Sequence, residues 1–545
     1  MIITDLLERN AKDYPFDIAL VEINPLKKVD QYVTWKEYSL IQPSAKGEYR
    51  REISWKDFDA TANKFANMLL SKGVKKGDKI GILLMNSLEW LPIYFGVLKT
   101  GALAVPLNYR YTQDEIKYCL ELAECKVLVF GFEFIGRIEA IFDELKNIKN
   151  IIYVGENTPT FSESYDEYIN LYSSVKPNIS LIEDDDAAIY FSSGTTGFPK
   201  AILHTHKALI NSAITEQAHH NQTKDDCFLC IPPLYHTGAK MHWFGSLYSG
   251  SKAVLLRGVK PEWILETVSL EKCTIVWLLV PWVQDILDAI DNKTLDLSNY
   301  ETKQWRLMHV GAQPVPPSLI NRWLKVFPNH DYDTNYGLSE SIGPGCVHLG
   351  IENIKKVGSI GKAGFNWKTK IVDENKQEIT VPEKVGELAV KGPGVMKCYF
   401  NNEKATKEIL DGPWLMTGDM AKYDSDGFIY LVDRKKDVII SGGENLYPVQ
   451  IEDFIRQNDK VKDVAVIGIP DKRLGEATLA IVSIKDGMSM NEDEFNDFCT
   501  ALPRYKRPRK VIFADVPRNP TGKIEKPKLR KMYSTQNLVE EQTTA

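Results

Sequence analysis

The sequence predicts an α/β protein: a large N-terminal domain of parallel-rich α/β subdomains plus a β subdomain, followed by a small α+β C-terminal domain. In the first 180 residues, segments with helical periodicity alternate with short apolar strands. This rhythm is typical of parallel sheets covered by helices. After about residue 350, strand-like segments separated by Gly, Pro and Asp turns predominate, which indicates an antiparallel β subdomain. From residue 437 onward, helical and strand patterns are mixed again.

The individual elements follow from local patterns. Residues 55–72 carry apolar side chains at helical spacing and stop at Gly73, which predicts a helix. Residues 88–100 predict a second helix. Near the C-terminus, residues 447–457 predict a helix and residues 461–471 a strand. Strands of the N-terminal sheets are expected at residues 102–108, 126–130, 150–154, 187–191 and 253–256.

A charged run, DRKKD at residues 433–437, lies between two strand-like segments. A solvated turn would have the same composition. Because the character of the sequence changes on its two sides, we expect the domain boundary there. The prediction is an N-terminal domain of residues 1–433, a hinge at 434–436 and a C-terminal domain of residues 437–545.

Composition excludes several classes of protein. With 67 Lys and Arg against 73 Asp and Glu, the net charge of −6 argues against a nucleic-acid binder. The eight cysteines lack the spacing of a disulfide framework and suit a reducing cytoplasm. Cys227 and Cys230 form a C-x-x-C surrounded by apolar residues, for which a buried strand is expected. Neither a signal peptide nor a stretch of bilayer length is visible, so a cytoplasmic protein without an integral membrane segment is predicted.

The segment YFSSGTTGFPK, residues 190–200, has the composition of a loop that binds phosphate. It is not a Walker loop, because Phe198 and Pro199 separate Gly197 from Lys200, and Ala201 follows where a hydroxyl is required. A flexible linker is the alternative, but the apolar run before the segment indicates a buried strand that leads into a loop. Glycines let backbone N–H groups approach an anion, hydroxyls add donors, and lysine adds charge. The predicted phosphate contacts are Ser192, Ser193, Gly194, Thr195, Thr196, Gly197 and Lys200.

Further motifs follow in a fixed order, and together they resemble the adenylate-forming superfamily of acyl-CoA synthetases, peptide-synthetase adenylation domains and luciferases. The resemblance covers nearly the whole chain and is closest to the AMP-forming acyl-CoA synthetases. The motifs are PLYHTG (233–238), HVGAQP (309–314), NYGLSE (335–340), GELAVKGPG (386–394), WLMTGD (414–419), DRKKDVIISGGENLYPVQIE (433–452), LPRYKRP (502–508) and NPTGKIEK (519–526).

The resemblance implies an ATP site in which Glu340 binds Mg²⁺ and Lys523 bridges the substrate carboxylate and the α-phosphate. A carboxylate and a polyphosphate are both anions, so their reaction needs cations and donors where charge gathers. Asp419 would accept the ribose hydroxyls with help from Arg434. Besides the phosphate loop, the implied ATP contacts are Gly311, Ala312, Gln313, Asn335, Tyr336, Gly337 and Ser339.

For the second half-reaction the resemblance implies CoA as the acceptor and a C-terminal domain that is mobile and rotates about Lys436. The pantetheine arm would contact Gly442, Gly443 and Glu444. His236 would lie beside the acyl carboxylate, with Lys240 and Gly311 also at the acyl group. Lys240 stands where fatty acyl members often have an aromatic or apolar residue. It lines either a solvated rim or the pocket of a functionalised acid.

The sequence therefore predicts an ATP-dependent, AMP-forming carboxylic acid–CoA ligase with ATP, Mg²⁺ and CoA as co-substrates. The expected acid is a medium-chain or functionalised fatty acid, or an aromatic acid, which points to fatty acid metabolism. An acyl-AMP ligase or a stand-alone adenylation enzyme that loads a carrier protein is the alternative. Whether the chain forms a homodimer is left open.

Overall fold

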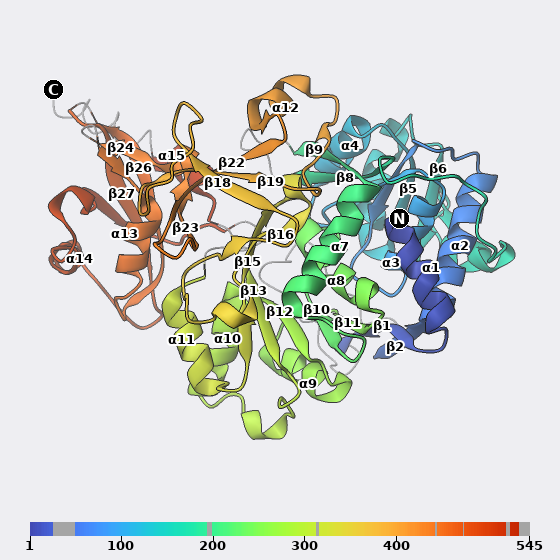
Figure 1. Ribbon diagram of the computed structural model, residues 1–545, viewed down its shortest axis with the longest axis horizontal. Helices are drawn as coiled ribbons and strands as arrows, with labels where there is room; N and C mark the ends of the chain where they lie inside the picture. Colours follow the sequence, from blue (N-terminus) through green and yellow to red (C-terminus); the bar gives the residue numbers. More distant parts are fainter. Residues whose placement is uncertain are drawn as a thin grey trace. The chain divides into compact units, whose positions relative to one another are not determined.

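A computed structural model describes residues 1–25, 49–192, 199–311, 315–441, 444–471, 473–518 and 524–533. The chain forms two compact units (Figure 1). Unit 1 comprises Met1–Thr369 and Val390–Leu415, and unit 2 comprises Lys370–Ala389 and Met416–Ala545. Unit 2 thus takes in much of the β subdomain as well as the C-terminal residues. The predicted α/β fold class is confirmed, while the hinge at 434–436 stays a prediction.

The first large sheet of unit 1 has six parallel strands and one antiparallel edge strand. Its parallel strands are buried along most of their length, as expected for a sheet covered on both faces, whereas the antiparallel edge strand is not. The predicted buried strand at Cys227 and Cys230 is confirmed. In spatial order the strands are β14 (Asp331–Asp333), β13 (Leu307–Gly311), β12 (Ile275–Leu279), β10 (Cys227–Cys230), β11 (Lys252–Leu256), β1 (Ile18–Ile23) and β2 (Arg50–Ser54).

The second large sheet is also mainly parallel, but β9 and β20 extend it in antiparallel fashion at one edge. All the strands predicted between residues 102 and 191 belong to it. In spatial order they are β20 (Cys398–Tyr399), β9 (Lys200–Thr205), β8 (Asp186–Ser192), β4 (Leu103–Pro106), β3 (Lys79–Leu83), β5 (Cys125–Gly131), β6 (Asn150–Val154) and β7 (Glu163–Ser164).

Helices cover these sheets, and the two that were predicted in detail begin and end within two residues of expectation. The side chain of Ser54 caps the first of them by accepting a hydrogen bond from the Asp57 N–H at 3.1 Å. The helices of unit 1 are α1 (Ile3–Asp13), α2 (Trp55–Ser71), α3 (Trp90–Lys99), α4 (Gln113–Leu122), α5 (Ile135–Ile141), α6 (Tyr165–Tyr168), α7 (His206–His220), α8 (Thr237–Ser249), α9 (Pro261–Glu271), α10 (Val280–Asp291), α11 (Pro317–Val326) and α12 (Glu403–Ile409).

Helix α8 lies with α7 between the two large sheets (Figure 1). Its residues Ala239, Trp243, Phe244 and Leu247 are fully buried. A helix enclosed in this way cannot be amphipathic, because it meets protein on both sides. A small third sheet of β15 (Asn335–Leu338), β16 (Gly343–His348) and β17 (Lys362–Ala363) packs against the same helix pair through β16.

Strands β18 (Lys368–Val372), β19 (Gly386–Lys391), β21 (Leu410–Asp411), β22 (Trp414–Tyr423) and β23 (Ile429–Arg434) form the sheet of the predicted β subdomain. Unit 2 contains most of this sheet. The predicted C-terminal helix and strand are confirmed as α13 and β26. The further elements of unit 2 are β24 (Ile439–Ser441), β25 (Glu444–Leu446), α13 (Pro448–Ile455), β26 (Val461–Asp471), β27 (Gly475–Ile484), α14 (Glu492–Cys499), β28 (Lys510–Phe513) and α15 (Lys526–Tyr533). No helix in the described part of the chain has the length and apolar character needed to cross a bilayer.

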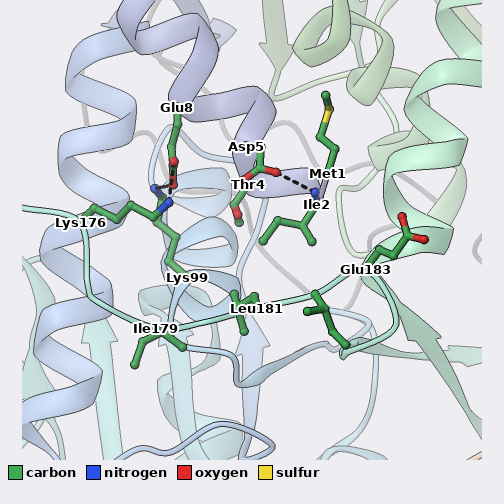
Figure 2. A pocket seen from close by; sticks show the side chains of 11 residues that line it. Met1, Ile2, Thr4, Asp5, Glu8, Lys99, Lys176, Ile179, Leu181 and Glu183 are labelled. Atoms are coloured by element: carbon green, nitrogen blue, oxygen red, sulfur yellow. Dashed lines mark hydrogen bonds and ion pairs between the residues drawn. The ribbon is translucent and has the colours of Figure 1, made fainter.

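A buried ion-pair network ties the N-terminal helix to the core of unit 1. The Lys99 ammonium at the end of α3 lies 2.9 Å from both Glu8 of α1 and Asp59 of α2, and the Lys99 side chain is only 1% exposed. Lys176 contacts the same Glu8 carboxylate from the surface at 2.8 Å. Figure 2 shows Glu8 between the two lysines, in a pocket beside the first residues of the chain.

Replacing Lys99 by Met should destabilise the protein by about 3 kcal/mol, because it leaves two partly buried carboxylates without their cation. Lys176→Met removes the other cation from Glu8, but the Lys176 side chain is 56% exposed, so its loss should cost less than about 1 kcal/mol. Thermal unfolding midpoints of the two variants and the wild type measure the difference. Equal shifts for the two variants would contradict the structural role of Lys99.

Candidate active site

The predicted phosphate loop connects two antiparallel strands. Strand β8 ends at Ser192, and its register partner Lys200 begins β9. A Walker loop leads from a strand into a helix, so the exclusion of that motif is confirmed. Residues 193–198, which include Ser193, Gly194, Thr195, Thr196 and Gly197, lie outside the described residues.

Tyr399 contacts both Lys200 and Glu340. The Lys200 ammonium lies 4.8 Å from the centre of the Tyr399 ring, and the Tyr399 hydroxyl donates to Glu340 Oε1 at 2.8 Å. Tyr399 reaches this position because β20 pairs with β9, and the Met396 N–H fixes the Glu340 carbonyl at 2.7 Å. Burial, together with the negative charge of Glu340, raises the pKa of the Tyr399 phenol. Sequence reasoning missed Tyr399, which belongs to no motif.

Ser339 joins the same region to the start of α8. Its carbonyl lies 2.8 Å from His204 Nε2 on β9, and its hydroxyl lies 3.5 Å from the hydroxyl of Thr237. His236, the residue before α8, is half-buried, with its ring 4.9 Å from that of Tyr235. The structure therefore brings Lys200, Glu340, Ser339 and the backbone of the His236 motif into one region of unit 1.

Further predicted ATP contacts lie on two neighbouring elements, β13 and β15. Asn335, Tyr336 and Gly337 form β15, where the Tyr336 side chain is buried. Gly311 ends β13, and a Cβ built on it would lie 4.0 Å from Asn335 Oδ1. The structure thus places Gly311 beside Asn335, while the contact of these residues with ATP stays a prediction. Ala312 and Gln313 lie outside the described residues.

In unit 2, Asp419 and Arg434 are register partners on β22 and β23. Arg434 Nε lies 3.1 Å from Asp419 Oδ1, and Asp419 is 5% exposed. The predicted pairing of these two side chains is present, while their contact with ribose stays a prediction. Lys436 and Glu444 are exposed. Gly442, Gly443 and Lys523 lie outside the described residues.

The chain around Lys436 is held by neighbours within unit 2. Asp437 forms an ion pair with Arg530 of α15, with the two charged groups 2.7 Å apart. The buried carboxylate of Asp433 accepts a hydrogen bond from the Val449 N–H at 2.9 Å. Burial raises the pKa of Asp433 to about 6, although Lys526 opposes this shift. The predicted pivot therefore lies between two anchored carboxylates.

Lys240 is fully buried in α8 rather than at a solvated rim. Its ammonium faces the rings of Tyr190, Tyr94 and Trp90, at 4.0, 4.2 and 5.3 Å from their centres. Within the described part of the chain its nitrogen has no hydrogen-bonding partner. Burial lowers the pKa of Lys240 well below 10.5. Successive residues of a helix turn by about 100°, so Lys240 points away from the side of α8 that carries Gly238 and His242.

The side of α8 that carries Gly238 and His242 packs against a buried cluster of histidines and carboxylates. No motif or spacing in the sequence predicts this cluster. His220 of α7 lies 3.0 Å from Glu216 and 3.2 Å from Asp333, and His348 lies 2.9 Å from Asp333. His242 also contacts Glu216, and His309 Nδ1 lies 2.9 Å from His220 Nε2. Burial alone would lower the pKa of His220, but the carboxylates of Glu216 and Asp333 outweigh it and raise that pKa to about 10. His220 is therefore an imidazolium between two carboxylates.

Two groups of three side chains in this cluster lie close enough together to hold a metal ion. They are His220 with His242 and His309, and His220 with Glu216 and His348. Within the cluster, His220 uses both of its ring nitrogens, one toward Glu216 and the other toward His309. His309 Nε2, by contrast, has no hydrogen-bonding partner among the described residues.

Comparison with known proteins settles the family. The model of the AMP-binding enzyme family matches residues 7–400, and that of the AMP-binding enzyme C-terminal domain matches residues 450–523. The chain belongs to the AMP-binding enzyme family.

Several relatives within the family carry names that state an activity. The long-chain-fatty-acid–CoA ligase FadD13 of Mycobacterium tuberculosis is 31% identical over 88% of this chain and 93% of its own length. The anthranilate CoA ligase AuaEII, solved with anthranoyl-AMP, is 25% identical with a TM-score of 0.86, covering 99% of this chain and 98% of its own. The o-succinylbenzoate CoA synthetase of Bacillus subtilis, solved with its acyl-adenylate, is 26% identical with a TM-score of 0.80, covering 96% and 98%.

Lys240→Met should stabilise the protein near neutral pH, because it removes an amine that must either bury its charge or lose a proton. The folded-state pKa of Lys240 lies below its unfolded value of 10.5, so the unfolded state binds more protons between the two values. Wild-type stability relative to the variant should therefore rise with pH across that window.

Thermal unfolding midpoints of both proteins from about pH 7 to about pH 10 measure this difference. Lys207→Met on α7, whose side chain is 45% exposed, is the control and should shift the midpoint by the same small amount at each pH. A gap between wild type and Lys240→Met that stays constant as pH rises would argue against a neutral buried amine.

Proposed function

We propose that this family member is an AMP-forming carboxylic acid–CoA ligase. In the first step, a carboxylate oxygen of the acid attacks the α-phosphorus of ATP, and the bond to the β-phosphate breaks to release pyrophosphate. In the second step, the sulfur of CoA attacks the acyl carbon, AMP leaves, and the thiol proton passes to solvent. The named activities of FadD13, AuaEII and the o-succinylbenzoate enzyme support this function.

The main support for the proposal is the contact of Tyr399 with both Lys200 and Glu340, because Lys200 begins the strand that follows the phosphate loop. Charge builds up on the β- and γ-phosphates as pyrophosphate leaves, and a preorganised cation there lowers the barrier. Lys200 supplies such a cation. Tyr399 holds the Glu340 carboxylate in place through its 2.8 Å hydrogen bond.

Glu340 also fits the role of a magnesium ligand. Mg²⁺ is usually bound by one or two carboxylates together with substrate phosphates, and Glu340 offers a hard oxygen beside Lys200. A bound ion would neutralise charge on the phosphates. The remaining contacts are proposed from the family resemblance: Tyr336 and Gly311 at adenine, Asp419 with Arg434 at ribose, Gly442, Gly443 and Glu444 at CoA, Lys523 at the α-phosphate and Lys436 as pivot.

The acid proposed is a medium-chain or functionalised fatty acid, or an aromatic acid. The position of Trp277 against α8 supports this choice, because a bulky ring beside the predicted acyl-binding residues would shorten a pocket for a long alkyl chain. Trp277 meets Gly238 so closely that a Cβ on the glycine would lie 2.9 Å from the indole. Two relatives named for aromatic acids are consistent with such a pocket.

Pyrophosphate release over a panel of acids, with and without CoA, tests the function. Release that depends on the acid, with a CoA thioester formed when CoA is present, is the expected result. Acid-dependent adenylate without thioester would favour transfer to a carrier protein. No acid-dependent release across alkyl, keto and aromatic acids would overturn the proposal.

Tyr399→Phe should lower the rate of adenylation about tenfold and raise the Mg²⁺ concentration needed for half-maximal rate, because a hydrogen bond to a carboxylate is lost. Initial rates of pyrophosphate release over a Mg²⁺ titration measure both effects. Tyr168→Phe, whose side chain is exposed on α6, is the control and should match the wild type. An unchanged Mg²⁺ dependence in Tyr399→Phe would separate Tyr399 from the proposed metal ligand.

Lys523→Ala should slow adenylation by about a hundredfold or more, because a cation that bridges the two reacting anions is lost. Thioester formation from supplied acyl adenylate should be largely retained. Lys528→Ala, which removes an exposed lysine of α15, serves as the control for both half-reactions. Equal losses in the two half-reactions would show that Lys523 is not specific to adenylation.

A further inference from the structure

We propose that Trp277 and His309 together recognise a neutral oxygen atom that the acid carries at a distance from its reacting carboxylate. The inference rests on the proposed function and names its substrate class: compact acids with a ketone, phenol or ether oxygen, in preference to unsubstituted alkyl or aryl acids. Trp277 and His309 are then the residues that determine specificity.

The two side chains share one face of a sheet. Trp277 of β12 and His309 of β13 are register partners in parallel strands, so their side chains point to the same side. Gly311, two residues further along β13, lies on that side too, about 7 Å from His309 along the strand. Helix α8 covers this face, with Gly238 against the Trp277 ring and the His242 ring 4.3 Å from it.

Both side chains aim an unpartnered nitrogen at Gly311. A Cβ on Gly311 would lie 3.7 Å from Trp277 Nε1 and 4.0 Å from His309 Nε2, with Asn335 Oδ1 as the third near atom. Trp277 is 5% exposed and His309 is fully buried, yet neither nitrogen has a hydrogen-bonding partner among the described residues. Buried polar groups in proteins are usually paired, and these two unpartnered nitrogens lie near the same glycine, so together they indicate a ligand that pairs both.

The polar cluster behind His309 determines that its Nε2 is a donor. Burial, with neighbouring His242 and His220, lowers the pKa of His309 well below 6.5, so its ring is neutral. His220 is an imidazolium, so its Nε2 carries a proton and cannot accept; this N–H lies 2.9 Å from His309 Nδ1 and 3.2 Å from Asp333 Oδ2, which leaves His309 Nδ1 only the role of acceptor. A neutral imidazole that accepts at Nδ1 carries its proton on Nε2. Trp277 can only donate, so two N–H donors converge near Gly311 and require an acceptor.

The acceptor is an uncharged oxygen. Glu216 and Asp333 bring two negative charges to the cluster, and His220 compensates only one of them. A second carboxylate on the substrate would add another anion in a buried place without a cation to meet it.

The test compares acids that differ only in one oxygen. Pairs are a medium-chain alkanoic acid with its keto derivatives, the ketone moved along the chain, and phenylbutyric acid with benzoylpropionic acid. The wild type should prefer one position of the oxygen over the plain acid by at least about tenfold in kcat/KM. Trp277→Phe keeps an aromatic ring and loses the N–H, so it should reduce that preference about tenfold, because kcat/KM should fall much further for the oxygenated acid than for the plain acid.

His309→Gln retains an N–H donor and should keep part of the preference, whereas His309→Leu should lose it. Trp323→Phe is the matched control, because Trp323 of α11 is a fully buried tryptophan whose Nε1 also lacks a partner among the described residues. It should leave the preference unchanged.

Three outcomes would overturn the inference. The first is a wild-type kcat/KM that is the same for plain and oxygenated acids. The second is an equal fall of kcat/KM for both kinds of acid in Trp277→Phe. Neither of these two results would contradict the proposed ligase function. The third is one equivalent of zinc in the purified protein that is lost in His309→Leu, which would make the cluster a metal site. Absence of activity toward every acid would instead count against the proposed function.

Discussion

The enclosure of α8 between two large sheets is the constraint on which much of unit 1 depends. A helix with protein on both sides has no solvent to accept its polar side chains, so each one needs a partner or must lose its charge. His242 meets Glu216 on one side, and Lys240 lies against three aromatic rings on the other. The same helix begins immediately after His236 and contacts Ser339 through Thr237. Packing of α8 therefore fixes both its buried polar groups and the start of the candidate active site.

Buried polar side chains on the two sides of α8 have different surroundings. On the sheet of β12 and β13, carboxylates and imidazoles compensate one another, and the raised pKa of His220 is the consequence. On the sheet of β8, the amine of Lys240 has only ring faces near it, so its pKa falls. An imidazolium held between two carboxylates has defined proton positions, which allows the cluster to orient a donor such as His309 Nε2. An isolated amine has no such effect on its neighbours.

Tyr399 shows how the active region is assembled from distant parts of the chain. Its strand β20 adds to the edge of the second large sheet beside β9, which carries Lys200. This pairing brings a phenol between a lysine and a glutamate that are 140 residues apart in the sequence. In unit 2, Asp419 and Arg434 come together by the same means, as register partners on neighbouring strands. Strand register, rather than loop sequence, places these side chains.

The sequence by itself determined the α/β class, the bounds of α2 and α3 to within two residues, the buried strand at Cys227 and Cys230, and the strand before the phosphate loop. These depend on periodicity and on glycine and proline, which act over a few residues. Its motifs also identified Lys200, Glu340 and His236, which the fold then brought to one region. Only the tertiary structure decided that Lys240 is buried, that Tyr399 contacts both Lys200 and Glu340, and that His220 lies within hydrogen-bonding distance of Asp333 and His309. Such contacts join residues far apart in the chain, and their energies depend on burial and on the charges nearby, neither of which a local pattern contains.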